Sequence, residues 1–264
     1  MPRKNNNPSI ASWQNPVRVI RESIGLIGFW MTLRYLLIYL LSYKPFNDRS
    51  FDRRHGTDTG GMVPTQDLDI DDESTKWQSN LYLGSPDRVT RHLIRSLDID
   101  PADYTFVDYG SGKGRVLFAA AEFPFKKVVG VEISQALHEV AERNQLLYVG
   151  APLQSEIALW CGDAREFRLP EGNLILHMYH PFGPDILKDM LQLIQDSDEP
   201  GRRILVPYLF SIGVSKAVFQ EFPAFARVRD ELCVNNLYRW TLYELKNELK
   251  KTEPSQDGSD VVAS

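Results

Sequence analysis

Three glycines and an aspartate alternate with other residues in one short stretch of the chain, FVDYGSGKGR at 106–115. Asp108 precedes glycines at 110, 112 and 114, and the stretch lies between an apolar run and an alanine-rich one. Glycine has no side chain and tolerates left-handed conformations, so such a loop lets a ligand approach the backbone closely. The loop could hold a phosphate, a dinucleotide or a ligand that carries no phosphate.

The residues around the glycines differ from two well-defined phosphate-binding loops. A P-loop needs lysine followed by serine or threonine, whose hydroxyl reaches magnesium. Here Lys113 is followed by Gly114 and Arg115, which excludes that loop. A dinucleotide-binding loop needs a third glycine at the position that Arg115 occupies. The sequence therefore disfavours a nicotinamide-dependent oxidoreductase.

The glycine loop lies where a predicted strand gives way to a predicted helix, and this alternation continues along the chain. The apolar strands are expected over 104–110, 126–134, 157–163, 173–179 and 202–210. The intervening helices are expected over 114–123, 134–149, 183–196 and 214–222. Apolar strands alternating with amphipathic helices are typical of a parallel sheet covered on both sides. Two last runs, 225–234 and 237–246, flank Asn235-Asn236 and predict an antiparallel hairpin.

The pattern Asp-x-Gly-x-Gly-x-Gly at the end of the first strand resembles motif I of the class I S-adenosylmethionine-dependent methyltransferases. The chain is similar in particular to uncharacterised bacterial members related to the non-SET lysine methyltransferases. The resemblance covers about residues 82–245 and implies S-adenosyl-L-methionine as the cofactor. It also implies an α/β fold, a doubly wound, seven-stranded and mostly parallel Rossmann-like sheet with an antiparallel C-terminal hairpin.

The resemblance implies a cofactor site at the carboxyl ends of the strands. Glu132 ends the second strand, where a carboxylate can accept both ribose hydroxyls; the alternative for it is a surface acid. Asp163 would accept from the adenine amino group, and the backbone of Ala164 would contact the ring. The expected cofactor-binding residues are Tyr82, Asp108, Gly110, Ser111, Gly112, Gly114, Glu132, Ile133, Asp163 and Ala164.

The fourth strand ends in HMYHPFG, which implies a place for the methyl acceptor. Relatives that methylate amino groups often carry Asn or Asp, then Pro and an aromatic residue here, and these hold the target nitrogen. This chain has His180-Pro181-Phe182, preceded by Tyr179, so histidine replaces the expected amide or acid. His180 could bond the acceptor or take up a proton near neutral pH; alternatively it is a strand-end residue bonded to backbone.

The predicted function is methyl transfer to an unidentified acceptor, with a protein or small-molecule amine favoured and hydroxyls and other small metabolites left open. One alternative is a catalytically silent scaffold or sensor that binds S-adenosylmethionine; a nicotinamide-dependent oxidoreductase is a weaker one. No metal site is expected, because His177 and His180 are three residues apart and would face opposite sides of a strand. A net charge of -5 gives no strong sign of nucleic-acid binding.

The N-terminal part, residues 1–80, is predicted as an extension of the methyltransferase domain at 81–247, and 248–264 as a disordered tail. Residues 23–43 form an apolar run about long enough to cross a bilayer, with Arg34 inside it. A helix packed on the core, a helix on a membrane surface and a spanning helix all stay open. Two distant cysteines favour a reducing compartment, so the predicted location is cytoplasmic, with membrane association through 23–43 left open.

Three further segments precede the first predicted strand. Residues 46–64 are rich in Gly, Asp and Thr and are expected to form a loop, part of which could close as a lid. The acidic stretch 66–74 is expected to be a solvated connector. Residues 85–99 predict a helix with Ser85 and Asp87 as caps.

Overall fold

The computed structural model describes residues 50–197, 199–210, 213–233 and 238–246, together with Phe29, Trp30 and Leu33. Apart from those three residues, the predicted apolar helix at 23–43 lies outside the described residues, as do the turn at Asn235-Asn236 and the tail at 248–264. Within the described ranges, no helix combines the length and the apolar character needed to cross a bilayer.

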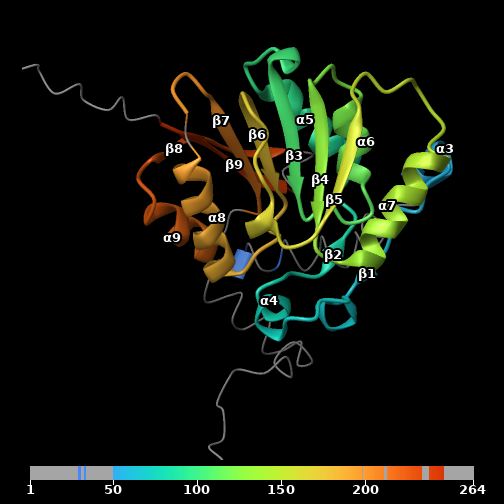
Figure 1. Ribbon diagram of the computed structural model, residues 1–264, viewed down its shortest axis with the longest axis horizontal. Helices are drawn as coiled ribbons and strands as arrows, with labels where there is room; N and C mark the ends of the chain where they lie inside the picture. The colour runs from blue at the N-terminus through green and yellow to red at the C-terminus, as the bar shows by residue number, and fades with distance from the viewer. Residues whose placement is uncertain are drawn as a thin grey trace, which may run out of the picture.

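A seven-stranded sheet with the order β5-β4-β3-β6-β7-β9-β8 forms the centre of the fold (Figure 1). Its strands are β3 Tyr104–Tyr109, β4 Lys127–Glu132, β5 Ile157–Cys161, β6 Asn173–Met178, β7 Ile204–Leu209, β8 Phe225–Cys233 and β9 Tyr238–Leu245. The strands from β3 to β7 pair in parallel, whereas β9 pairs antiparallel with both β7 and β8. The predicted α/β fold, with its antiparallel C-terminal hairpin, is confirmed.

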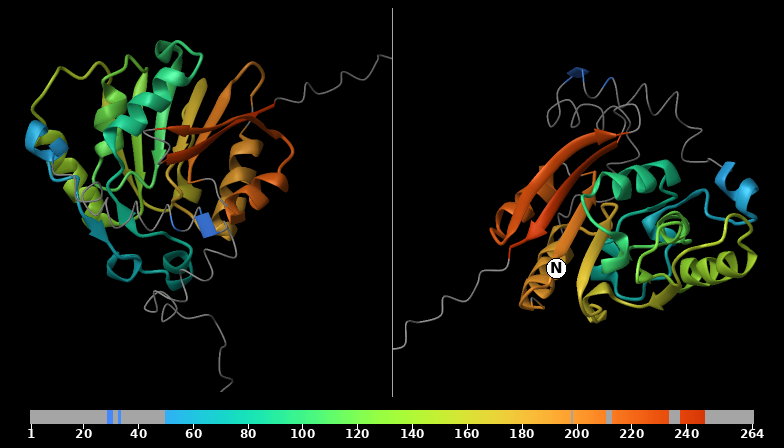
Figure 2. Two further views of the ribbon diagram at one scale, coloured as in Figure 1. Left: turned by 180° about the vertical axis from the view of Figure 1, so that it is seen from behind. Right: turned by 90° about the horizontal axis from the view of Figure 1, so that it is seen from above.

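Helices cover both faces of this sheet. Their bounds are α5 Asp87–Ser96, α6 Arg115–Ala121, α7 Gln135–Leu147, α8 Pro184–Asp196 and α9 Gly213–Gln220. The apolar residues of α5 and α6 pack in one core cluster and those of α8 and α9 in another, on opposite sides of the sheet (Figure 2). Phe106 and Val107 are neighbours in β3 and belong to different clusters, because successive strand residues point to opposite faces. This arrangement explains why the central strands are apolar throughout.

The predicted caps of the first core helix are wrong. Helix α5 begins at Asp87 with Pro86 as its N-cap, and no side chain caps it. Proline suits this place because the first N–H groups of a helix have no partner within it. Asp87 instead forms an ion pair with Arg91, one helical turn later. Arg91 also forms an ion pair at 2.6 Å with Glu122, the residue that follows α6.

The segments before α5 are more ordered than the sequence predicts. The expected loop at 46–64 contains helix α3, Ser50–His55, and strand β1, Met62–Val63, which pairs antiparallel with β2, Tyr82–Leu83. The expected solvated connector contains the 3-10 turn η2, Thr65–Asp67, and the start of helix α4, Glu73–Trp77. The loop prediction is wrong over α3 and β1, because the burial of Phe51 is not revealed by local composition. The acidic residues of 66–74 are exposed as predicted, and only Leu68 and Ile70 in this stretch are buried.

These N-terminal elements take up one end of the molecule. In Figure 1, α4, β1 and β2 lie at the end of the sheet where the parallel strands finish. Two short 3-10 turns complete the described fold, η3 at Pro101–Asp103 and η4 at Ala164–Glu166. The carboxyl edge of the sheet, where open α/β folds bind ligands, is therefore covered by residues that precede α5.

Candidate functional site

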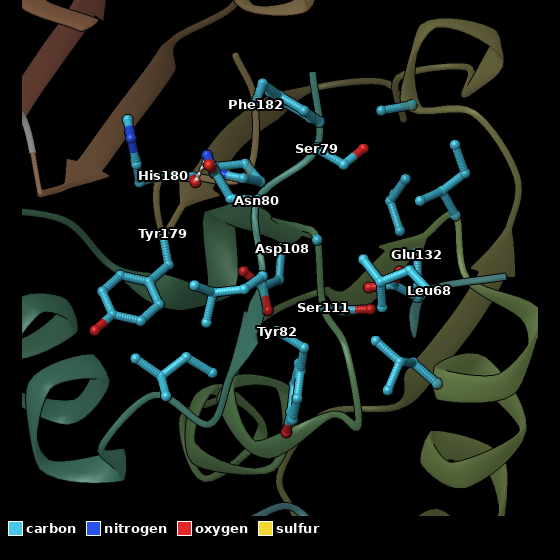
Figure 3. Close-up of a pocket in the computed structure, with 18 of the residues that line it drawn as sticks. Leu68, Ser79, Asn80, Tyr82, Asp108, Ser111, Glu132, Tyr179, His180 and Phe182 are labelled. Atoms are coloured by element: carbon cyan, nitrogen blue, oxygen red, sulfur yellow. Dashed lines mark hydrogen bonds between the residues drawn. The ribbon is translucent and has the colours of Figure 1, made fainter. Parts of the chain in front are cut away.

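A cavity of about 450 Å³ lies at the carboxyl ends of the parallel strands, a size typical of small-molecule sites. Figure 3 shows Glu132 and Leu68 at one end of it and Tyr179 and His180 at the other. Most of the predicted residues line this cavity: Tyr82, Asp108, Gly110, Ser111, Glu132, Ile133, Asp163, Ala164, Tyr179, His180, Pro181 and Phe182. Two predicted residues, Gly112 and Gly114, lie outside its lining.

The glycine loop is shaped by close contacts that only glycine allows. Gly110 and Gly112 have φ angles of 74° and 53°, in the left-handed region that favours glycine. A Cβ atom on Gly110 would lie 2.9 Å from the Pro181 Cβ, and one on Gly112 would overlap the Tyr82 ring. Gly114, with a φ of 91°, is the N-cap of α6. The loop thus has Pro181 against one glycine and Tyr82 against the next.

Arg115, which stands where a dinucleotide-binding loop would have its third glycine, connects residues 52–59 to the glycine loop. Its buried guanidinium donates from Nε to the Thr59 hydroxyl at 2.7 Å and lies 3.4 Å from an Asp52 carboxylate oxygen. The Thr59 carbonyl accepts the Tyr82 hydroxyl at 2.7 Å. Asp52 and Thr59 therefore hold the ring that packs on Gly112. Sequence reasoning missed both residues, because nothing local marks them as partners of a helix more than fifty positions later.

Glu132 is buried at the end of β4, which excludes the alternative of a surface acid. One carboxylate oxygen accepts the Gly112 N–H at 2.7 Å and the other accepts the Ser134 N–H at 2.9 Å. Burial raises the pKa of Glu132 to about 7, and these backbone hydrogen bonds only partly oppose that effect. The group can therefore change its charge near neutral pH.

This raised pKa predicts a pH-dependent stability. Between about 4.5, the ordinary pKa, and about 7, the folded state holds the Glu132 proton that the unfolded chain has released. Stability therefore falls as pH rises through this window. We expect the free energy of unfolding of the wild type to drop by up to about 3 kcal/mol relative to Glu132→Gln, from 1.36 kcal/mol per pKa unit. Urea unfolding of both proteins at pH 5, 6, 7 and 8 measures this, and a constant difference would contradict the shift.

Asp108 and His177 form a buried pair on adjacent strands. The Asp108 carboxylate lies 2.6 Å from His177 Nδ1, and the two residues are opposite each other in the β3–β6 register. Burial raises the pKa of Asp108, and the neighbouring imidazole opposes that rise. The Nε2 atom of His177 is buried without a hydrogen-bond partner among the described residues. Asp108 lines the cavity together with Glu132 and Asp163, so His177 holds one of these three carboxylates in the cavity wall.

The charges around the cavity favour a cationic ligand. Of the described lining residues, Arg115 is the one with a permanently positive side chain, and Asp52 and Thr59 engage it. Asp108 and Glu132 are both buried in the wall. A phosphate would meet these acids without a free cation, whereas a sulfonium or ammonium group would be attracted to them.

The end of the cavity predicted to hold adenine has apolar walls, and its carboxylate, that of Asp163, is already bonded to Arg165. Leu68 and Leu137 line the cavity beside Ile133. The Asp163 carboxylate accepts the Arg165 N–H at 2.9 Å and pairs with its guanidinium at 2.6 Å, which lowers the pKa of Asp163. An adenine amino group would have to share this carboxylate. Sequence reasoning missed Leu68, although the alternation of leucine and isoleucine with aspartates at 67–71 could have indicated a half-buried segment.

At the end of the cavity opposite Glu132 lie His180 and Tyr179. The His180 ring is hydrogen-bonded within the protein, and the Tyr179 hydroxyl is buried. His180 has a φ of 48°, unusual for a residue other than glycine, and its Nδ1 lies 2.9 Å from the Tyr208 hydroxyl. Burial lowers the pKa of His180, which favours the neutral imidazole. The Tyr179 ring packs on Phe210, and its hydroxyl is buried without a partner among the described residues.

Residues 73–177 match the protein family described as "Histone methylation protein DOT1". The curated proteins include a histone-lysine N-methyltransferase, H3 lysine-79 specific, of Dictyostelium discoideum that is 27% identical over 139 residues. That alignment covers 49% of this chain and 8% of the relative, so the chain spans a small part of the relative's length. The predicted resemblance to lysine methyltransferases is confirmed, and the predicted enzyme class and cofactor agree with it.

Solved structures of methyltransferases are among those to which this chain is similar. An RNA methyltransferase from Salinibacter ruber, in complex with S-adenosyl-L-homocysteine, is 17% identical and covers 63% of this chain and 96% of its own, with a TM-score of 0.43. A magnesium protoporphyrin IX methyltransferase from Synechocystis, with bound S-adenosylmethionine, is 14% identical and covers 61% and 79%, with a TM-score of 0.45. Values this low support no particular substrate, and the fold assignment rests on this chain's own sheet topology.

Proposed function

We propose that this chain transfers a methyl group from S-adenosyl-L-methionine to an amine, with a lysine side chain of a protein as the acceptor. The observation that carries the proposal is the pair of buried carboxylates, Asp108 and Glu132, in a cavity at the carboxyl edge of the sheet. The family similarity of residues 73–177 supports the same cofactor and the same acceptor class.

The cavity fits this cofactor in charge and shape. When bound, S-adenosylmethionine supplies an electrophilic methyl group on a positively charged sulfur. Glu132 has a carboxylate available to ribose hydroxyls, and Asp108 lies beside the glycine loop, where it favours the cationic part of the ligand. Gly110 and Ser111 line the same wall, and Leu68, Ile133 and Leu137 supply apolar surface for a ring.

The protein's contribution to methyl transfer is mainly alignment, which can supply about 7–11 kcal/mol. An amine must also be neutral, because a protonated nitrogen has no lone pair to offer. The residues proposed to face the acceptor are Tyr179, His180, Pro181 and Phe182, at the end of the cavity opposite Glu132. The lowered pKa of His180 keeps this end free of an added positive charge, which favours the neutral amine.

Titration calorimetry with S-adenosylmethionine and, separately, with S-adenosylhomocysteine tests the cofactor. We expect both to bind, and Glu132→Ala to weaken binding by about 2–4 kcal/mol, the range for removing a partner of buried hydrogen-bonded groups. Gln192→Ala, an exposed change on α8, is the matched control and should leave affinity unchanged. Unchanged affinity in Glu132→Ala would remove the ribose assignment.

The acceptor is tested by transfer of radiolabelled methyl groups to polylysine and to purified core histones. Transfer to lysine in either probe supports the proposal. Cofactor binding with no transfer to these or to small amines would favour a silent scaffold instead. The scaffold outcome requires that the cofactor binds while no methyl group is transferred. Calorimetry and methyl transfer are therefore measured on the same protein preparation.

A further inference from the structure

A short strap, defined here as residues 78–83, crosses the cavity and is bonded to the loop after β6. The Gln78 carbonyl accepts the Gly183 N–H at 2.5 Å, Ser79 forms an isolated antiparallel bridge with Phe182, and Asn80 N–H donates to the Pro181 carbonyl at 3.2 Å. The strap therefore lies directly against the loop that is proposed to face the acceptor (Figure 3).

Asn80 brings a side-chain amide to that loop. Its Nδ2 donates to the His180 carbonyl at 2.7 Å, the bond drawn between them in Figure 3. The residue lines the cavity and is exposed, so it lies at the mouth, where an acceptor would enter. None of the hydrogen bonds among the described residues engages its Oδ1. The amide is thus held by its nitrogen and presents its oxygen.

The loop itself lacks an amide or acid at the place where related amine methyltransferases have one. His180 occupies that place, and its Nδ1 is taken by the Tyr208 hydroxyl. A carbonyl oxygen has two lone pairs, so the His180 carbonyl can accept one further hydrogen besides that of Asn80. The Asn80 Oδ1 and this carbonyl are therefore two acceptors on adjacent segments at one end of the cavity.

We propose that Asn80 is an acceptor-binding residue whose Oδ1 receives an N–H of the target amine, in place of the amide that the loop lacks. This inference rests on the proposed function. A primary amine fits because it has at least two hydrogens to donate to the two oxygens while its nitrogen is directed into the cavity. An acceptor hydroxyl would have one hydrogen for the same two oxygens, so the arrangement favours amines over alcohols.

The test uses sinefungin, a cofactor analogue in which a carbon bearing a primary amine replaces the methylsulfonium. Its amine takes the place of the transferred methyl group. The affinity for sinefungin therefore reports on hydrogen bonds at the acceptor end of the cavity, and no methyl acceptor needs to be known. Calorimetry compares sinefungin with S-adenosylhomocysteine for the wild type, Asn80→Ala, Asn80→Asp and the control Gln192→Ala. Thermal unfolding confirms that each variant is folded.

We expect Asn80→Ala to weaken sinefungin about tenfold or more, as for a hydrogen bond to a charged group, and to change S-adenosylhomocysteine affinity less than twofold. Asn80→Asp loses the Nδ2 bond to the His180 carbonyl but keeps an acceptor oxygen and adds a negative charge opposite the sinefungin ammonium, so it should lose less sinefungin affinity than Asn80→Ala. Equal losses of both ligands, or no loss of either, would overturn the inference while leaving the proposed function in place. Failure of S-adenosylhomocysteine to bind the wild type would overturn the proposed function and this inference together.

Discussion

Gly112→Ala should lower the free energy of unfolding by about 2–5 kcal/mol and displace the wall of the cofactor cavity. The left-handed conformation of Gly112 accounts for about 1–2 kcal/mol of this loss. The new methyl group would also overlap the Tyr82 ring, and overpacking adds about 1–3 kcal/mol. The ring cannot move freely, because its hydroxyl is bonded to the Thr59 carbonyl. Urea unfolding and calorimetry with S-adenosylhomocysteine measure the two effects.

Gly172→Ala separates the conformational part of this loss from the steric part. Gly172 has a φ of 77°, and a Cβ atom there would meet no atom within 4 Å. We expect this control to lose about 1–2 kcal/mol of stability and to keep its cofactor affinity. Equal losses at positions 112 and 172, with affinity intact in both, would show that Tyr82 does not restrict the loop.

Asp52→Ala should destabilise the protein by about 3–5 kcal/mol, the range for breaking a buried ion pair. Arg115 is the first residue of α6, where the helix dipole disfavours a positive charge. One carboxylate oxygen of Asp52 lies 3.4 Å from the Arg115 guanidinium and offsets this unfavourable charge. The other oxygen accepts the Thr59 N–H at 2.7 Å and the Thr57 hydroxyl at 2.9 Å. Removing the carboxylate breaks these contacts together and frees the segment that holds Tyr82. Chemical denaturation measures the loss.

An exposed ion pair of the same length provides the control. Lys127 and Glu156 are also 3.4 Å apart, but their side chains are 43% and 74% exposed. Glu156→Ala should change stability by about 1 kcal/mol or less, because water and salt screen such pairs. If Asp52→Ala and Glu156→Ala had the same effect, the buried network would not be what anchors the N-terminal segment.

The sequence predicts the fold well from residue 104 onward, because each element there carries its own pattern. All seven strands and four of the helices that follow occur where expected, and only their ends differ. The strand predicted over 157–163 ends at Cys161, for example, because Asp163 turns to cap η4. Before residue 85 the pattern is weak. Helix α3 and the buried Leu68 depend on contacts with elements much later in the chain, which composition cannot show.

Part of the candidate site could likewise be predicted from the sequence, and part could not. The acids and glycines were identifiable because they lie beside predicted strand ends, and the structure brings the acids and Gly110 to one cavity. Asn80 and Thr59 have no such spacing, since their partners are 100 and 56 positions away. The sequence could not show that the His180 ring bonds Tyr208, because that follows from a left-handed backbone angle. The predicted domain boundary at residue 80 also divides residues that line one cavity.

The bonds between the strap and the loop after β6 have a consequence during synthesis. Asn80 leaves the ribosome 100 residues before the His180 carbonyl to which it bonds. At about 5–20 residues per second, this separation corresponds to about 5–20 s. Phe51 and Leu68, buried in the finished protein, wait for less of that time, because Arg115 over the Phe51 ring and Leu137 beside Leu68 follow them by 64 and 69 residues. The strap itself cannot take its final place until β6 and the loop after it have been made, so the mouth of the cavity is completed late in synthesis.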